Sequence, residues 1–127
     1  MEGYNMQALL IEKGNIKWIE IEKDFDSKKA RKLLKTKETI SSSKRFFLGW
    51  SFRVFHKDYV PNPSFFATMN PDDTPDIPEE CIITLIEDWN DEEEILGINS
   101  VVESFLLENL LSYKNKDIIQ PILKWRI

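Results

Sequence analysis

The sequence has one cysteine, one histidine and four glycines in 127 residues. Because Cys81 is alone, an intramolecular disulfide is excluded and a zinc site would lack thiolate ligands. So few glycines make a phosphate-binding loop hard to build, and neither His-Glu-x-x-His nor Gly-x-Ser-x-Gly occurs. There is no N-terminal signal segment and no run of eighteen apolar residues, so we expect a cytoplasmic protein outside the membrane.

Lys and Arg are absent from residues 58–113, which hold fourteen Asp and Glu residues. Residues 28–57 are the opposite, with ten Lys and Arg against Glu38 alone. The net charge of −5 disfavours nonspecific nucleic-acid binding by the whole chain. Apolar residues make up 42% and charged residues 31%, which indicates a single globular domain over residues 1–127.

The first half predicts a hairpin, a basic helix and a long strand. Residues 7–13 and 16–22 alternate as strands around Gly14-Asn15, a hairpin turn. Asp26 or Ser27 can cap a helix over 28–37, and 36–43 looks like a loop. Period-two alternation predicts one strand over 45–57 at the centre of the sheet, with Gly49 marking a bend.

The second half predicts a second hairpin and an apolar helix. Ser100-Val101-Val102-Glu103 matches a capping box, and the helix should run to about Tyr113, with Phe105 buried against Trp50 and Phe52. The other expected segments are a strand over 64–69, a proline-rich loop over 70–80, a strand over 81–87, a turn over 88–93, a strand over 94–98, and an edge strand or short helix over 117–127. This order predicts an α+β fold, a mostly antiparallel sheet of hairpins with two helices packed on one face.

Candidates for catalysis and metal binding are few. His56 could act as a general base, but the sequence nominates no nucleophile or carboxylate partner for it. Cys81 opens an apolar strand and is typical of a small core residue. Asp88, Asn90 and Glu92 resemble the start of a calcium loop, yet Glu93 replaces the glycine that its sixth position needs. We therefore expect no enzyme, no metal and no cofactor.

The densest acidic run, Glu87 to Glu94, contains one large aromatic residue. One interpretation is a loop kept charged for solubility. The other is a binding site in which an aromatic anchor is surrounded by steering charge, attractive to a basic protein surface. The expected partner-binding residues are Asp88, Trp89, Asp91, Glu92, Glu93 and Glu94, with Asp72, Asp73 and Asp76 adding long-range attraction.

The C-terminal third, from Cys81 to Leu111, combines three features: the apolar strand Ile82-Ile83-Thr84-Leu85, an acidic turn, and the helical segment Val102-Glu103-Ser104-Phe105-Leu106-Leu107. In this combination it resembles the end of the SUKH-type immunity proteins of bacterial toxin systems. The first eighty residues depart from that family. The resemblance implies a small acidic protein that binds and blocks another protein.

The leading hypothesis is a non-enzymatic acidic inhibitor of a basic, toxin-like or nuclease-like protein, either an immunity protein or a phage-type anti-nuclease or anti-defence factor. The first alternative is a nucleic-acid-associated module that uses the basic segment 28–57, with Lys28, Lys29, Arg31, Lys32 and Lys35. The second is a small enzyme built around His56. The basic segment of one copy could also meet the acidic segment of another, so self-association is a further expectation.

Overall fold

The computed structural model describes residues 6–12, 15–47, 49–57, 66–68, 77–78, 80–89, 92–109, 111–114 and 117–121. The side chains of Phe47, Trp89, Asn109 and strands β5, β6, β9 and β10 lie outside this description. In chain order the elements are β1 (Met6–Glu12), β2 (Asn15–Ile21), α1 (Ser27–Leu33), β3 (Ile40–Phe47), β4 (Trp50–Lys57), β5 (Phe66–Thr68), β6 (Ile77–Pro78), β7 (Cys81–Trp89), β8 (Glu92–Leu96), α2 (Ser100–Asn109), β9 (Leu111–Lys114) and β10 (Asp117–Pro121).

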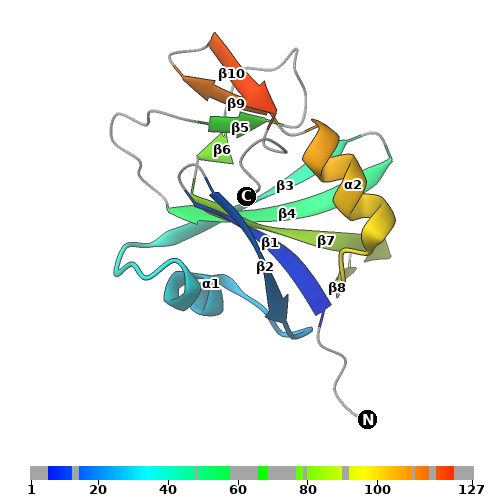
Figure 1. Cartoon of the computed structure of the whole chain (residues 1–127). Coiled ribbons are helices and arrows are strands. Elements are labelled where there is room, and N and C mark those ends of the chain that lie inside the picture. Colours follow the sequence, from blue (N-terminus) through cyan, green and yellow to red (C-terminus); the bar gives the residue numbers. More distant parts are fainter. Residues whose placement is uncertain are drawn as a thin grey trace.

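The main sheet is antiparallel and is organised around β7. Its strand order is β2-β1-β7-β4-β3, and β8 also pairs with β7. One edge of β7 pairs with β4, whereas its other edge pairs first with β1, at Cys81–Ile83, and then with β8, at Leu85–Trp89. A smaller sheet has the order β10-β9-β5-β6 and lies above the main sheet in Figure 1. The α+β class and the mostly antiparallel sheet are confirmed.

The two helices lie on opposite faces of the main sheet, which corrects the expectation that both pack on one face (Figure 1). Alternate residues of β7 divide between two cores, because successive side chains of a strand point to opposite faces. One core joins Leu9, Ile11, Phe52, Val54, Cys81, Ile83 and Leu85 to Ile98 and to Val102, Leu106 and Leu107 of α2. The other joins Ala8, Leu10, Ile21, Ile40, Phe55 and Ile82 to Phe25 and to Ala30 and Leu34 at α1.

The expected single strand over residues 45–57 is wrong, because the chain reverses within it. β3 and β4 form a hairpin in which Phe47 pairs with Trp50, and the loop expected over 36–43 contains the start of β3. Gly49 has φ of 92°, a conformation that costs glycine little and other residues more. The reversal places Phe46 at a position where its side chain is 73% exposed.

Both helices are shorter than the sequence predicted. α1 is capped by Asp26, whose Oδ1 accepts from Lys29 N at 3.0 Å, and it ends at Leu33. α2 is capped by Asn99 rather than Ser100, since Asn99 Oδ1 accepts from Val102 N at 3.0 Å. It ends at Asn109, so the segment expected to finish the helix forms β9 instead.

The remaining expectations are confirmed in part. The hairpin of β1 and β2 and the hairpin of β7 and β8 are both present. The turn expected over 88–93 is shorter, because β7 runs to Trp89 and β8 begins at Glu92. Of the expected edge strand or short helix over 117–127, residues 117–121 form the edge strand β10, which fits Pro121, and residues 122–127 lie outside the described residues. Phe52 is fully buried, but Trp50 and Phe105 are only partly buried.

Candidate functional site

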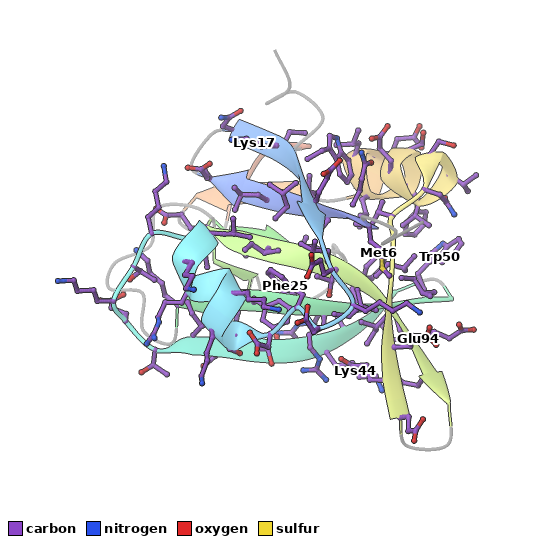
Figure 2. The ribbon with its side chains drawn as sticks, turned by 90° about the horizontal axis from the view of Figure 1, so that it is seen from below. Met6, Lys17, Phe25, Lys44, Trp50 and Glu94 are labelled. Carbon is purple, nitrogen blue, oxygen red and sulfur yellow. The ribbon has the colours of Figure 1, made fainter. Side chains whose placement is uncertain are left out.

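The β7–β8 hairpin carries most of the predicted binding residues and projects from the main sheet (Figure 2). β4 pairs with β7 only as far as Ile86, so the last residues of β7 have β8 as their partner among the described strands. Glu87 pairs with Glu94, Asp88 with Glu93, and Trp89 with Glu92. The hairpin therefore has two faces, each continuous with one face of the sheet.

The face on the α1 side is neutralised by basic residues of β3 and β4. Arg53 donates from Nε and Nη2 to the two carboxylate oxygens of Glu93, at 2.6 and 2.7 Å. Arg53 Nη1 also donates to Ser42 Oγ at 3.1 Å, and Lys44 forms an ion pair with Asp88. The hydrogen-bonded Glu93 carboxylate raises the pKa of Arg53 above its ordinary value. This face is a fixed charge network.

The face on the α2 side keeps an excess of negative charge. The strand register places Glu87, Glu92 and Glu94 on this face, and Glu87 is directly opposite Glu94. Like charges in that arrangement destabilise a sheet. The described ion pairs bring one cation here, Lys23, whose Nζ lies 3.4 Å from Glu94 Oε1 with both side chains exposed. An exposed ion pair of this kind contributes little to the stability of the fold, and it offsets the negative charge of the glutamates only weakly.

Of the predicted binding residues, the structure places Asp88, Glu92, Glu93 and Glu94 together on the β7–β8 hairpin, with Trp89 in β7 opposite Glu92. Asp91, Asp72, Asp73 and Asp76 lie outside the described residues. Sequence reasoning missed the cations that meet the hairpin, Lys23, Lys44 and Arg53. Alternation along β4 indicated which face Arg53 occupies, but the pairing partner depends on the register between strands far apart in the chain.

The basic segment divides into two parts. Lys44, Arg53 and Lys57 pair with acidic residues of the same chain, Lys57 with Glu80 at 3.6 Å. On α1, Lys29 pairs with Asp24, and this contact raises the pKa of Lys29 and lowers the pKa of Asp24. We define the α1 region as residues 27–35. Its exposed cations with no ion pair to the described residues are Lys28, Arg31, Lys32 and Lys35.

His56 and Cys81 are neighbours in the sheet, since they pair across β4 and β7. His56 is partly buried, and its Nδ1 donates to the Lys57 carbonyl oxygen at 2.8 Å. Cys81 is fully buried, and burial raises the pKa of its thiol, which keeps it protonated. No group of three or more His, Cys, Asp or Glu side chains suited to a metal ion occurs among the described residues.

Neither α1 nor α2 is long and apolar enough to cross a membrane. Comparisons of the chain with protein-family models, with curated proteins and with solved structures find no match.

Proposed function

We propose that the chain is a non-enzymatic binding protein whose β7–β8 hairpin docks on a basic surface of a partner protein and blocks it. The observation that carries this proposal is the asymmetry of the hairpin. Asp88 and Glu93 pair with cations on one face, whereas on the face of Glu87, Glu92 and Glu94 the ion pairs of the described residues include one cation, Lys23, which contacts Glu94. A cationic partner would relieve the repulsion between these carboxylates. The free energy of binding should therefore be more favourable than at a face whose charges are separated by solvent.

The hairpin carboxylates then have separate roles. Asp88 and Glu93 hold the hairpin against β3 and β4, which fixes its direction before a partner arrives. Glu92 and Glu94 would contact the partner, and Trp89 and Asp91 are proposed as further contacts. Asp72, Asp73 and Asp76 would add attraction at longer range.

An inhibitor of a toxin or nuclease is the class that this surface fits best. Enzymes that act on nucleic acids present basic clefts, and a narrow acidic hairpin can enter such a cleft in place of the substrate. The strand and the helix that resemble SUKH-type immunity proteins correspond to β7 and α2, and the acidic segment between them includes the end of β7 and the start of β8. The proposal places the protein in the reducing cytoplasm, where the thiol of Cys81 needs no partner.

Charge-matched variants test the proposal once a partner has been recovered with the tagged chain. The hairpin variant replaces Glu87, Glu92 and Glu94 with Gln, and the control replaces three exposed glutamates elsewhere, Glu12, Glu38 and Glu108, with Gln. Both variants change the net charge equally. The hairpin variant should associate about tenfold more slowly at low salt, and the difference should fade as salt screens the charges. Equal association rates for the two variants would disprove the proposal.

A nucleic-acid-associated module is the second candidate, supported by the exposed cations of the α1 region, Lys28, Arg31, Lys32 and Lys35. Replacing these four with Gln should leave protein-partner binding intact if the first proposal is right. The second candidate would be favoured if the unmodified chain bound DNA or RNA at physiological salt and the variant bound more weakly, with a shallower salt dependence. Each phosphate contact contributes about 0.9 to the slope of log affinity against log salt concentration on duplex DNA.

A further inference from the structure

Over Glu92 to Leu96, the outer edge of β8 has no partner strand among the described residues. Within the described part of the chain, the backbone of these residues pairs with β7 alone. Two residues beyond β8, the Ile98 N–H donates to the Gln7 carbonyl oxygen at 3.0 Å. The start of β1 therefore contacts the chain just after β8 ends. Alternate residues of an edge strand turn their N–H and C=O groups outward. β8 therefore presents a short row of donors and acceptors for another chain.

A hollow of about 350 Å³ lies beside this edge. It is lined by the four consecutive residues Glu92 to Ile95 and by Lys23, which follows β2. Successive side chains of a strand point to opposite faces, so a hollow that touches four in a row follows the strand edge rather than one face. Ile95 gives it an apolar contact, and the glutamates give it negative charge.

We propose that an extended segment of the partner protein, bearing Lys or Arg, adds to β8 as a new strand of the main sheet. This inference rests on the proposed function and specifies how the basic partner is held. Backbone hydrogen bonds to β8 would supply affinity, and cations opposite Glu92 and Glu94 would supply selectivity. A second copy does not fit, because pairing β8 with another β8 sets one row of glutamates against another.

The opposite interpretation is that the glutamates protect the edge, as charged residues on edge strands often do. A blocked peptide of alternating Lys and Val distinguishes the two interpretations. The matched control peptide has the same sequence but carries methyl groups on the backbone nitrogens of two adjacent central residues. Because adjacent N–H groups of a strand point to opposite edges, this control removes donors from both edges while keeping the charge.

The readouts are peptide affinity and the exchange of individual backbone amides of the full chain at low salt. Strand addition predicts that the unmodified peptide slows exchange of alternate amides in Glu92 to Leu96 and binds at least about tenfold more tightly than the methylated one. Equal affinity of the two peptides, or absence of binding by both, with β8 amides unprotected, would overturn strand addition.

The proposed function is tested separately with the hairpin variant and the intact partner. If that variant slows association with the partner while the peptides leave β8 unprotected, charged docking stands and strand addition fails. If the variant and the control associate equally, the hairpin is not the binding surface and both proposals fail together.

Discussion

Arg53 holds Glu93 through two parallel hydrogen bonds, from Nε at 2.6 Å and from Nη2 at 2.7 Å. The two residues come from β4 and β8, strands that both pair with β7 but on its opposite edges. The contact therefore spans β7 on the α1 side and ties the projecting hairpin to the sheet. The arginine belongs to the basic segment 28–57 and the glutamate to the acidic run 87–94. Opposite charges that are separated in the sequence therefore meet in the fold.

The Arg53–Glu93 pair should contribute about 1 kcal/mol of coupling energy to the free energy of unfolding. Only 27% and 28% of the two side chains are exposed, so solvent screens this bidentate pair less than it screens Lys23–Glu94. The measurement is a double-mutant cycle with Arg53→Met and Glu93→Gln in denaturant. Coupling under about 0.3 kcal/mol would show that water separates the charges and that the hairpin is not held by this pair.

Phe52 and Phe46 test the orientation of the β3–β4 hairpin. Phe52 is fully buried against the α2 core, whereas Phe46 is 73% exposed on β3. Phe52→Ala should lower the free energy of unfolding by about 3–5 kcal/mol, as large core truncations do. Phe46→Ala should change it by no more than about 0.5 kcal/mol. Similar losses at both positions would contradict the reversal at Gly49.

Sequence patterns predicted those elements whose signals are local. Alternating apolar residues around Gly14 predicted the hairpin of β1 and β2, and the apolar run from Cys81 predicted β7. The expected turn at Gly14-Asn15 is not exact, because Asn15 is the first residue of β2 and pairs with Glu12. The reversal between β3 and β4 was missed because Phe46, Leu48, Trp50, Phe52 and Val54 keep period-two alternation across the turn. The alternation does not mark a single face, because Phe47 pairs with Trp50 and the parity of each face therefore switches across the reversal. Phe46 and Phe52 consequently lie on opposite faces although an even number of positions separates them in the sequence.

The placement of the helices and the ion pairs depends on contacts between distant segments. Consecutive apolar residues such as Ile82-Ile83 are typical of strands buried on both faces, and this signal could have placed α1 and α2 on opposite sides. The pairing of Lys44 with Asp88 and of Arg53 with Glu93 required the register of β3, β4, β7 and β8, which no local pattern contains. The acidic run was therefore found, but its division into two faces was not.

Asn99 and Ser100 distinguish the observed cap of α2 from the capping box in the sequence. Asn99 Oδ1 accepts the Val102 N–H, and its carbonyl oxygen accepts the Glu103 N–H at 2.8 Å. Asn99→Ala should destabilise the fold by about 1 kcal/mol, because a helix-end donor loses its partner. Ser100→Ala should change stability by less than about 0.5 kcal/mol. The reverse order in thermal or chemical unfolding would restore Ser100 as the cap.

Lys23 is an internal competitor for the partner of the hairpin, and its removal should strengthen binding. The Lys23 ammonium lies 3.4 Å from Glu94, and both side chains are largely exposed. A partner cation that reaches Glu94 must displace this lysine. Because an exposed ion pair contributes about 0.2–1 kcal/mol, Lys23→Gln should raise partner affinity by at most about fivefold. The matched control is Lys37→Gln, which removes the same charge from an exposed residue outside the hairpin. Lys37→Gln alters only the overall field, so its effect should be smaller and should disappear at high salt. If Lys23→Gln weakens binding or matches the control at every salt concentration, Glu94 does not contact the partner, and the contact belongs elsewhere on the hairpin.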